Sequence, residues 1–340
     1  MGLGRYILRR VFLSAIVVIG VTFLVFLAAQ VVPSDPAALY AGPRPSAEQI
    51  AKARAELNLD ASLPERFVHF AANMASGDFG VSYKTRRLIS QDLATFLPAT
   101  LELAAFSTLI AMLIGIPVGA MAAARQGGAL DRIGSLASIA AVAMPTFFLA
   151  MLLQFVFAKW LGVLPLSGRL SREIGISAPL TSVTGFALID ALLALRFDAF
   201  FDALAHLILP ALTLAAYPAG IAMRLTRSAM VEILERRHIL AARALGLPAR
   251  RILFGHALPN AVGPALTVLG LSFAFALTGA VLVEIIFAWP GLGRYVSEAI
   301  LSKDFPVIAA ATLVVTLCYV AMNLVLDLVQ AMVDPRVALK

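Results

Sequence analysis

The 340-residue sequence predicts an all-α membrane protein with six transmembrane helices, and two observations lead to this fold class. Hydrophobic residues make up 61% of the chain and charged residues only 14%, against roughly 45–50% and about 25% in an ordinary soluble domain. Six apolar runs reach the length of about 20 residues that a helix needs to cross a bilayer, and such a segment must be helical to satisfy its backbone in lipid. The composition therefore excludes a water-soluble globular protein.

The six predicted spans follow one another along the chain. They are residues 11–32, 99–124, 133–158, 203–223, 261–283 and 305–326. The first run is longer than the roughly 7–15 apolar residues of a signal peptide and no small-x-small cleavage site ends it, so we expect a retained helix. A shorter stretch, residues 186–195, is interrupted by Asp190 and is expected at the membrane interface or in an outer loop.

The distribution of charge predicts that both termini are cytoplasmic. With the N-terminus inside, an excess of arginine falls in the segments 125–132 and 224–260 and in the tail with Arg336 and Lys340. Acidic and basic residues balance in the outer segments. Because inner loops are enriched in Lys and Arg, the net charge of +7 indicates membrane orientation, and no nucleic-acid partner is expected.

The outer segment between the first two spans has helices of its own. Ser46 precedes Ala47-Glu48-Gln49, a capping-box spacing, and apolar residues then recur on one face of a helix. A second helix is predicted over residues 63–74. The expected domain organisation is residues 1–32 as the cytoplasmic N-terminus and first helix, 33–98 as an extracytoplasmic segment, and 99–340 as a five-helix core with the inner loop 224–260.

The sequence lacks the parts that catalysis or energy transduction would need. No Gly-Lys pair occurs, which excludes a phosphate-binding P-loop, and the four histidines form no H-E-x-x-H pair and no G-x-S-x-G turn exists. The single Cys318 excludes a disulfide framework and a cysteine metal site. We therefore expect no catalytic residue, no metal site and no cofactor on this chain.

Charged residues are scarce in the middle of the predicted spans. Glu102, Glu284 and Asp327 lie near span ends, whereas an ion-coupled carrier usually places an ionisable group near the bilayer midplane. This pattern favours a pore-forming subunit that another protein drives. An ion-coupled secondary carrier remains the alternative from a different class.

Several residues near span ends carry specific expectations. Glu102, close after Pro98, is expected in the first turn of its own helix, where it would cap the N-terminus. The G-x-x-x-G spacing of Gly115 and Gly119 predicts close helix packing. Glu284 is expected at the translocation path or gate, since a carboxylate facing lipid is costly.

The alternative for Glu284 is an interfacial residue that reaches headgroup water, with Trp289 as an aromatic at the membrane boundary. Pro290, Gly291 and Gly293 follow and predict a sharp outer turn.

The inner loop has the shape of a docking element. Its run Ala241-Ala-Arg-Ala-Leu-Gly-Leu247 predicts a short helix with small side chains that ends at Gly246, followed by Pro248. The alternative is an ordinary basic loop whose arginines lie at lipid headgroups.

This run, followed by His256-Ala-Leu-Pro-Asn260, resembles the EAA loop of binding-protein-dependent ABC importer permeases. Four further segments resemble the dipeptide/oligopeptide/nickel branch of that family, and within it most closely the first subunit of dipeptide permeases. They are Val283-Glu-Ile-Ile-Phe-Ala-Trp-Pro-Gly-Leu-Gly293, Leu57-Asn-Leu-Asp60 with Gly77-Asp-Phe-Gly-Val-Ser82, Val32-Pro-Ser-Asp-Pro36, and Val183-Thr-Gly-Phe-Ala-Leu-Ile-Asp190. The chain departs from the usual pattern at the leading Glu of the EAA box, at Arg237-His238 and at Asn58.

The resemblance implies the fold of a type I ABC importer permease in a bacterial inner membrane. It implies that Ala241, Ala242, Arg243, Ala244, Leu245, Gly246 and Leu247 couple the chain to an ATPase. The implied partners are a homologous second permease subunit, two ATP-binding subunits that carry ATP and Mg²⁺, an extracytoplasmic peptide-binding protein, and membrane lipid. The implied cargo is a dipeptide or short oligopeptide, with nickel or glutathione as alternatives.

Overall fold

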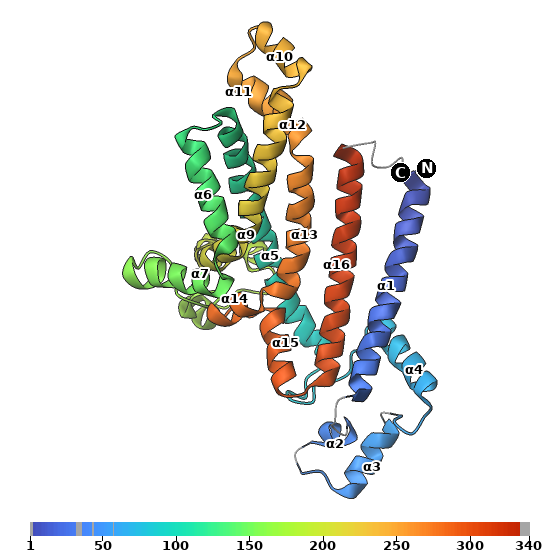
Figure 1. Cartoon of the computed structure of the whole chain (residues 1–340). Helices are drawn as coiled ribbons and strands as arrows, with labels where there is room; N and C mark the ends of the chain where they lie inside the picture. The colour runs from blue at the N-terminus through green and yellow to red at the C-terminus, as the bar shows by residue number, and fades with distance from the viewer. Residues whose placement is uncertain (1–2, 32–35, 43, 57, 334–340) are drawn as a thin grey trace. The chain divides into compact units, whose positions relative to one another are not determined.

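The computed structural model describes residues 3–31, 36–42, 44–56 and 58–333. Its helices fall into two compact units, Met1–Leu97 with Tyr295–Val320 and Pro98–Arg294 with Ala321–Lys340; Figure 1 labels the helices of both. Residues 32–35 of the Val-Pro-Ser-Asp motif, Leu57, and the tail residues Arg336 and Lys340 lie outside the described residues.

The first unit combines an apolar span with the helices of the outer segment. Its elements are α1 (Leu3–Val31), α2 (Pro36–Ala41), α3 (Ala47–Glu56), α4 (Leu63–Ser76), the first turns of α5 (Ile89–Ala124), most of α15 (Leu292–Leu301) and the first half of α16 (Phe305–Val333). The ring of Phe67 on α4 makes edge contacts with Phe23 and Phe26 on α1, with ring centroids 5.3 and 5.5 Å apart. These rings seat the amphipathic α4 on the last turns of the span.

Both helices predicted in the outer segment are confirmed, with the caps that position them. At the start of α3, the Gln49 backbone N–H donates to Ser46 Oγ at 3.2 Å and the Ser46 N–H donates to Gln49 Oε1 at 2.8 Å. At α4, Ser62 and Glu65 form the same reciprocal capping box. Each box satisfies N–H groups that a helix start leaves without a partner.

The second unit is built around one long helix, α9 (Phe197–Leu234). It contacts α6 (Ala129–Ala143), α7 (Thr146–Leu153), α8 (Ala187–Leu193), α12 (Leu258–Ala261) and α13 (Gly263–Gly279). α14 (Val281–Ile286) follows α13, and two π-helices, η1 (Gln154–Trp160) and η2 (Glu173–Ser177), lie between α7 and α8 in the chain.

The packing role predicted for Gly115 and Gly119 is confirmed. A Cβ atom on Gly115 would lie 2.7 Å from the carbonyl oxygen of Ala219, and one on Gly119 would lie 2.5 Å from that of Met223. The backbones of α5 and α9 approach this closely only because neither glycine has a side chain.

The six predicted spans correspond to four long helices and two bent pairs. By length and composition, α1, α5, α9 and α16 can each cross a membrane, and the count reaches six if each bent pair is one span. Residues 133–158 are not one straight helix: α6 ends at Ala143, and the following helix, α7 with η1, runs at 110° to it. Pro145 explains the break, since it lacks an N–H and drives Met144 into an extended conformation (ψ 125°).

The second bend lies at the fifth predicted span. α11 (Ala249–Arg251), η3 (Ile252–Ala257) and α12 form one continuous segment that meets α13 at 59°, next to Gly263 and Pro264. The apolar part predicted over residues 261–283 is mainly α13. The bend separates this span from the inner loop.

Candidate functional site

The inner-loop residues 241–247 form a short helix and its stop. α10 covers Arg237–Ala244, and Gly246 has φ +76°, a left-handed conformation that glycine adopts without strain. The Gly246 N–H donates to the carbonyl of Arg243 at 2.9 Å and that of Leu247 to Ala242 at 3.2 Å, which closes the helix end. The predicted stop at Gly246 is confirmed.

One face of α10 packs against the chain and the other is open. Ile239 is fully buried and Ala242 is 9% exposed, in an apolar cluster with Met230 and Ile233 of α9 and Ala120 of α5. Ala241, Arg243 and Ala244 are exposed, and Leu245 is 82% exposed. Of the predicted coupling residues, Ala242 therefore supports α10 from inside, whereas Ala241, Ala244 and Leu245 form its outer surface.

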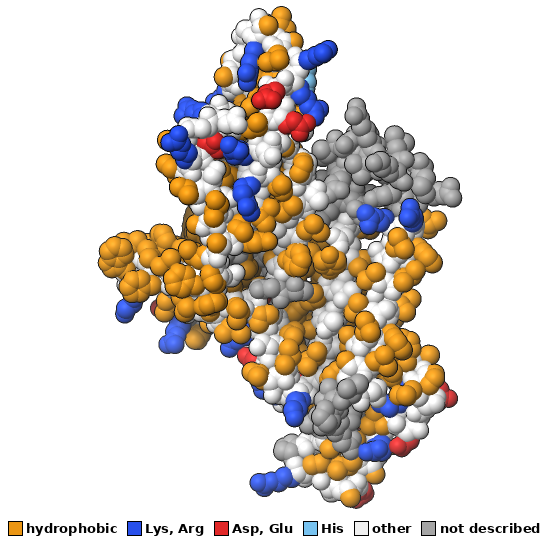
Figure 2. Space-filling view, in the orientation of Figure 1, with side chains coloured by type: hydrophobic (Ala, Val, Ile, Leu, Met, Phe, Trp, Pro, Cys, Tyr) orange, Lys and Arg blue, Asp and Glu red, His pale blue; other side chains and the backbone are white. Residues whose placement is uncertain are grey.

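The end of the second unit that carries α10 is strongly basic. Figure 1 places α10 and α11 beyond the end of α9, and Figure 2 shows Lys and Arg side chains gathered over them. Arg227 forms an ion pair with Asp131 at the start of α6, with Nη2 2.8 Å from Oδ2, and the Gly127 N–H donates to the same carboxylate at 2.9 Å. This pair fixes the short loop between α5 and α6 beside the inner loop.

The opposite end of the second unit contains a buried carboxylate. Glu284 on α14 is fully buried, and its carboxylate accepts hydrogen bonds from the Thr100 hydroxyl at 2.6 Å and from the Arg294 backbone N–H at 2.8 Å. Thr100 Oγ1 in turn accepts from the Leu292 N–H at 2.7 Å. Glu284 thus connects α5 to the outer turn, which we define as residues 287–293.

The glycines of the outer turn make room for this carboxylate. A Cβ atom on Gly291 would lie 2.2 Å from Glu284 Oε1, and one on Gly293 would lie 3.0 Å from Oε2. The described backbone gives positive φ to neither of them. The reason for glycine at both positions is therefore space: the carboxylate occupies the volume that their side chains would fill.

The alternative that placed Trp289 at the membrane boundary is wrong. Trp289 is 1% exposed, and its indole N–H donates to the carbonyl of Ala99 at 2.9 Å. The Arg169 guanidinium lies 5.8 Å from the centre of its ring. The ring is therefore a second link between α5 and the outer turn.

The expectation that Glu102 caps the N-terminus of its own helix is also wrong. α5 begins at Ile89, before Pro98, so Glu102 lies well inside the helix. Its carboxylate pairs with Arg169 at 2.6 Å and accepts from the Leu188 N–H at 2.9 Å. Glu102 instead attaches Arg169 and the start of α8 to α5.

Sequence reasoning missed three residues of the outer site. Thr100 lies 184 residues from Glu284 in the chain, Ala99 bonds Trp289 through its backbone carbonyl, and Arg169 lies 67 residues from Glu102. None belongs to a local motif. The proline-glycine turn itself was the only local signal.

The described residues contain no group of three or more His, Cys, Asp or Glu side chains that could hold a metal ion. His206, in the first third of α9, bonds through Nδ1 to the carbonyl oxygen of Asp202 at 2.8 Å. The charged groups of this site are held by other groups of the chain, and the arrangement suits a scaffold that positions helices.

Comparison of the sequence with known protein families matches nearly the whole chain to one family. Residues 115–339 match the binding-protein-dependent transport system inner membrane component, and residues 3–104 match the N-terminal part of this membrane component. The chain belongs to this family. It is a multi-pass inner membrane component of a binding-protein-dependent transport system, and this family is not itself catalytic and carries no cofactor.

Curated relatives match over nearly the whole length. A probable D,D-dipeptide transport system permease of Escherichia coli K12 is 43% identical over 322 residues, which cover 95% of this chain and 94% of the relative. A dipeptide transport system permease of the same strain is 38% identical over 336 residues, 98% of both chains. A di/tripeptide permease of Pseudomonas aeruginosa UCBPP-PA14 is 38% identical over 333 residues, 98% of both.

Proposed function

We propose that this chain translocates dipeptides or short oligopeptides as one permease subunit of an ATP-driven ABC importer. The full-length similarity to permeases named for dipeptide and di/tripeptide transport supports the cargo. The partners are a homologous second permease, two ATP-binding subunits with ATP and Mg²⁺, and an extracytoplasmic peptide-binding protein. The exposed surface of α10 is the observation that supports coupling, because an open helix with small side chains lets another backbone approach.

The mechanism couples two equilibria. ATP closes the partner ATPases, α10 docks on them, and the permease pair shifts between inward-facing and outward-facing states by thermodynamic linkage. The basic end that carries α10 faces the cytoplasm in this proposal, as the enrichment of arginine in inner loops favours. The N- and C-termini are then cytoplasmic, and the outer turn with Glu284, Pro290, Gly291 and Gly293 lies on the extracytoplasmic side at the gate.

Transport assays of the complete importer test the cargo. Uptake of radiolabelled dipeptide and of nickel-63 is measured in a strain that lacks other importers, with and without an intact ATPase subunit. We expect ATPase-dependent dipeptide uptake and no nickel uptake. Nickel uptake without dipeptide uptake would refute the peptide cargo, and dipeptide uptake that survives loss of every ATPase would instead favour the ion-coupled carrier.

A further inference from the structure

The first unit contains a cavity of about 450 Å³ that the transport mechanism does not use. Aromatic and apolar side chains line it from three places: Phe26 at the end of α1, Phe70 on α4, and Phe305 and Pro306 at the start of α16. Because α1 and α16 are both candidate spans, the cavity lies where two spans meet the outer segment. Phe23 and Leu24, close to Phe26 on α1, are exposed apolar side chains.

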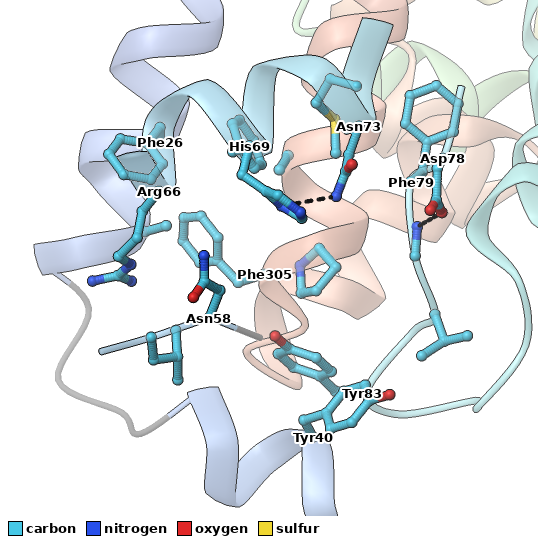
Figure 3. A pocket seen from close by; sticks show the side chains of 18 of the residues that line it. Phe26, Tyr40, Asn58, Arg66, His69, Asn73, Asp78, Phe79, Tyr83 and Phe305 are labelled. Atoms are coloured by element: carbon cyan, nitrogen blue, oxygen red, sulfur yellow. Dashed lines mark hydrogen bonds between the residues drawn. The ribbon is translucent and has the colours of Figure 1, made fainter. Parts of the chain in front are cut away.

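Basic and polar groups line the same cavity. Figure 3 shows Arg66 and His69 of α4 beside Phe26 and Phe305. These two residues are three positions apart, so they share one face of the helix. The Asn73 amide lies 3.3 Å from His69 Nδ1; since the amide nitrogen is a donor, Nδ1 is assigned as the acceptor, which leaves Nε2–H free to donate.

The remaining polar groups complete the charge pattern. Carboxylates of Glu56 and Asp78 line the cavity with the guanidinium of Arg66, and Asp78 Oδ1 accepts the Gly80 N–H at 3.1 Å. Burial, together with the Asp304 carboxylate, raises the pKa of Tyr83 to about 12, so its hydroxyl stays neutral. The cavity is thus lined by both cationic and anionic groups.

A second, apolar groove of about 460 Å³ lies next to this cavity on α1. Ile16, Ile19, Gly20 and Phe23 line it along the span, and Phe67 of α4 closes one end. Phe67 also contacts Phe26, which lines the first cavity. A Cβ atom on Gly20 would meet nothing within 4 Å, so the groove is open beside the helix.

We propose that the cavity and the groove together bind one molecule of phosphatidylethanolamine. The phosphate lies against Arg66 and His69, the ammonium faces Glu56 and Asp78, and an acyl chain follows Gly20 along α1. Charge complementarity selects this headgroup, because it carries one phosphate and one ammonium, and charge-assisted hydrogen bonds are the strong ones. The groove selects a lipid over a free zwitterion, because a peptide or a free phosphate has no chain to fill it.

Native mass spectrometry of phosphatidylethanolamine added back to the delipidated complete importer tests the proposal. Arg66→Gln removes the cation, and Gly20→Leu places a side chain in the groove at a position where a Cβ atom meets nothing within 4 Å. Each is expected to weaken phosphatidylethanolamine binding about tenfold, which corresponds to about 1.4 kcal/mol. Lys52→Gln on the exposed side of α3 and Ala15→Leu beside the groove are the matched controls, and both should bind as wild type.

Competition binding and a check of subunit assembly distinguish phosphatidylethanolamine from other possible occupants of the cavity and groove. Inorganic phosphate, a dipeptide, and glycerophosphoethanolamine without acyl chains should each fail to displace the lipid at equal concentration. Displacement by any of them, equal binding of phosphatidylglycerol, or unchanged binding in both Arg66→Gln and Gly20→Leu would overturn the proposal. Loss of the partner permease from purified Gly20→Leu importer would also overturn it, by assigning the groove to that subunit.

Discussion

At the residue scale, the fully buried Glu284 explains both the sequence motif of residues 283–293 and the glycines of the outer turn. Its carboxylate is held by a hydroxyl from α5 and by the backbone after the turn, and the two glycines leave the space it occupies. A buried carboxylate without such donors would be strongly destabilising. We therefore expect Glu284 to act at the gate by holding the outer turn on α5.

Substitution of Glu284 and of its donor tests this role. Glu284→Gln keeps the shape but loses the charge, and Thr100→Val removes the hydroxyl that links Glu284 to Leu292. Breaking one buried hydrogen bond costs about 1–3 kcal/mol, so we expect both variants to assemble and both to lower dipeptide uptake about tenfold.

The control for these variants is Thr108→Val, because Thr108 donates only to the Ala104 carbonyl of its own helix. Its uptake should match wild type. A loss of uptake in Glu284→Gln with normal uptake in Thr100→Val would show that the charge acts in the path by itself. Normal uptake in both would remove Glu284 from the gate.

At this scale, contacts between residues close in the chain were predictable from the sequence, whereas contacts between distant residues were not. The stop at Gly246, the capping box at Ser46 and the contact of Gly115 and Gly119 were predictable, since each depends on neighbours in the chain or on one side-chain property. The pairing of Glu102 with Arg169 was not, because the two residues lie 67 positions apart. The same holds for Thr100 and Glu284, 184 positions apart.

At the element scale, α10 is a short helix with an inner and an outer face. Ile239 and Ala242 anchor it in the apolar cluster of the inner loop, so its exposed residues are presented at a fixed angle. Periodicity alone predicted the helix and its end. It could not assign Ala242 to the inner face, because α10 is too short and too rich in alanine to show an apolar stripe.

Bulky substitutions on the two faces of α10 should have different effects. Ala241→Trp on the outer face should leave folding intact and abolish stimulation of the partner ATPase by the loaded binding protein, because the ring blocks docking. Ala242→Trp should destabilise the chain by about 1–3 kcal/mol through overpacking.

The measurements are ATPase activity of the reconstituted importer and the thermal unfolding midpoint of the purified chain. Ala249→Trp, exposed on α11 of the same loop, is the matched control and should behave as wild type in both. Normal ATPase stimulation and normal uptake in Ala241→Trp would contradict docking through this face.

The broken third span shows where element prediction fails. Composition identified residues 133–158 as apolar and long enough to cross, and Pro145 was visible in the middle. A proline inside a span is compatible with a mild bend or with a complete break. Packing of α7 against α9 and α14 accompanies the break here, and such tertiary contacts have no signature in the run itself.

At the scale of the whole molecule, the charge asymmetry predicts one orientation. Within the second unit, the basic residues around α10 lie at one end and the outer turn at the other. Single cysteines in a Cys318→Ser background test the orientation with an impermeant thiol reagent on spheroplasts. Lys52→Cys and Val183→Cys should react and Leu245→Cys should not, and all three positions are exposed.

Permeabilised spheroplasts provide the control, since all three cysteines should then react. Labelling of Leu245→Cys alone in intact spheroplasts would reverse the orientation and place both termini outside. Labelling of Lys52→Cys without Val183→Cys would contradict the predicted number of spans between the two positions.

The close contact of α5 with α9 has a mechanical consequence. α5 holds the outer turn through Ala99 and Thr100 and reaches the inner-loop cluster at Ala120, about 30 Å away along the helix axis. Between these points, Gly115 and Gly119 let the backbone of α5 pack directly on the backbone of α9. We therefore expect a displacement of α10 to reach the opposite end of this unit through α5 and α9 moving together, without a chain of side-chain rearrangements in between.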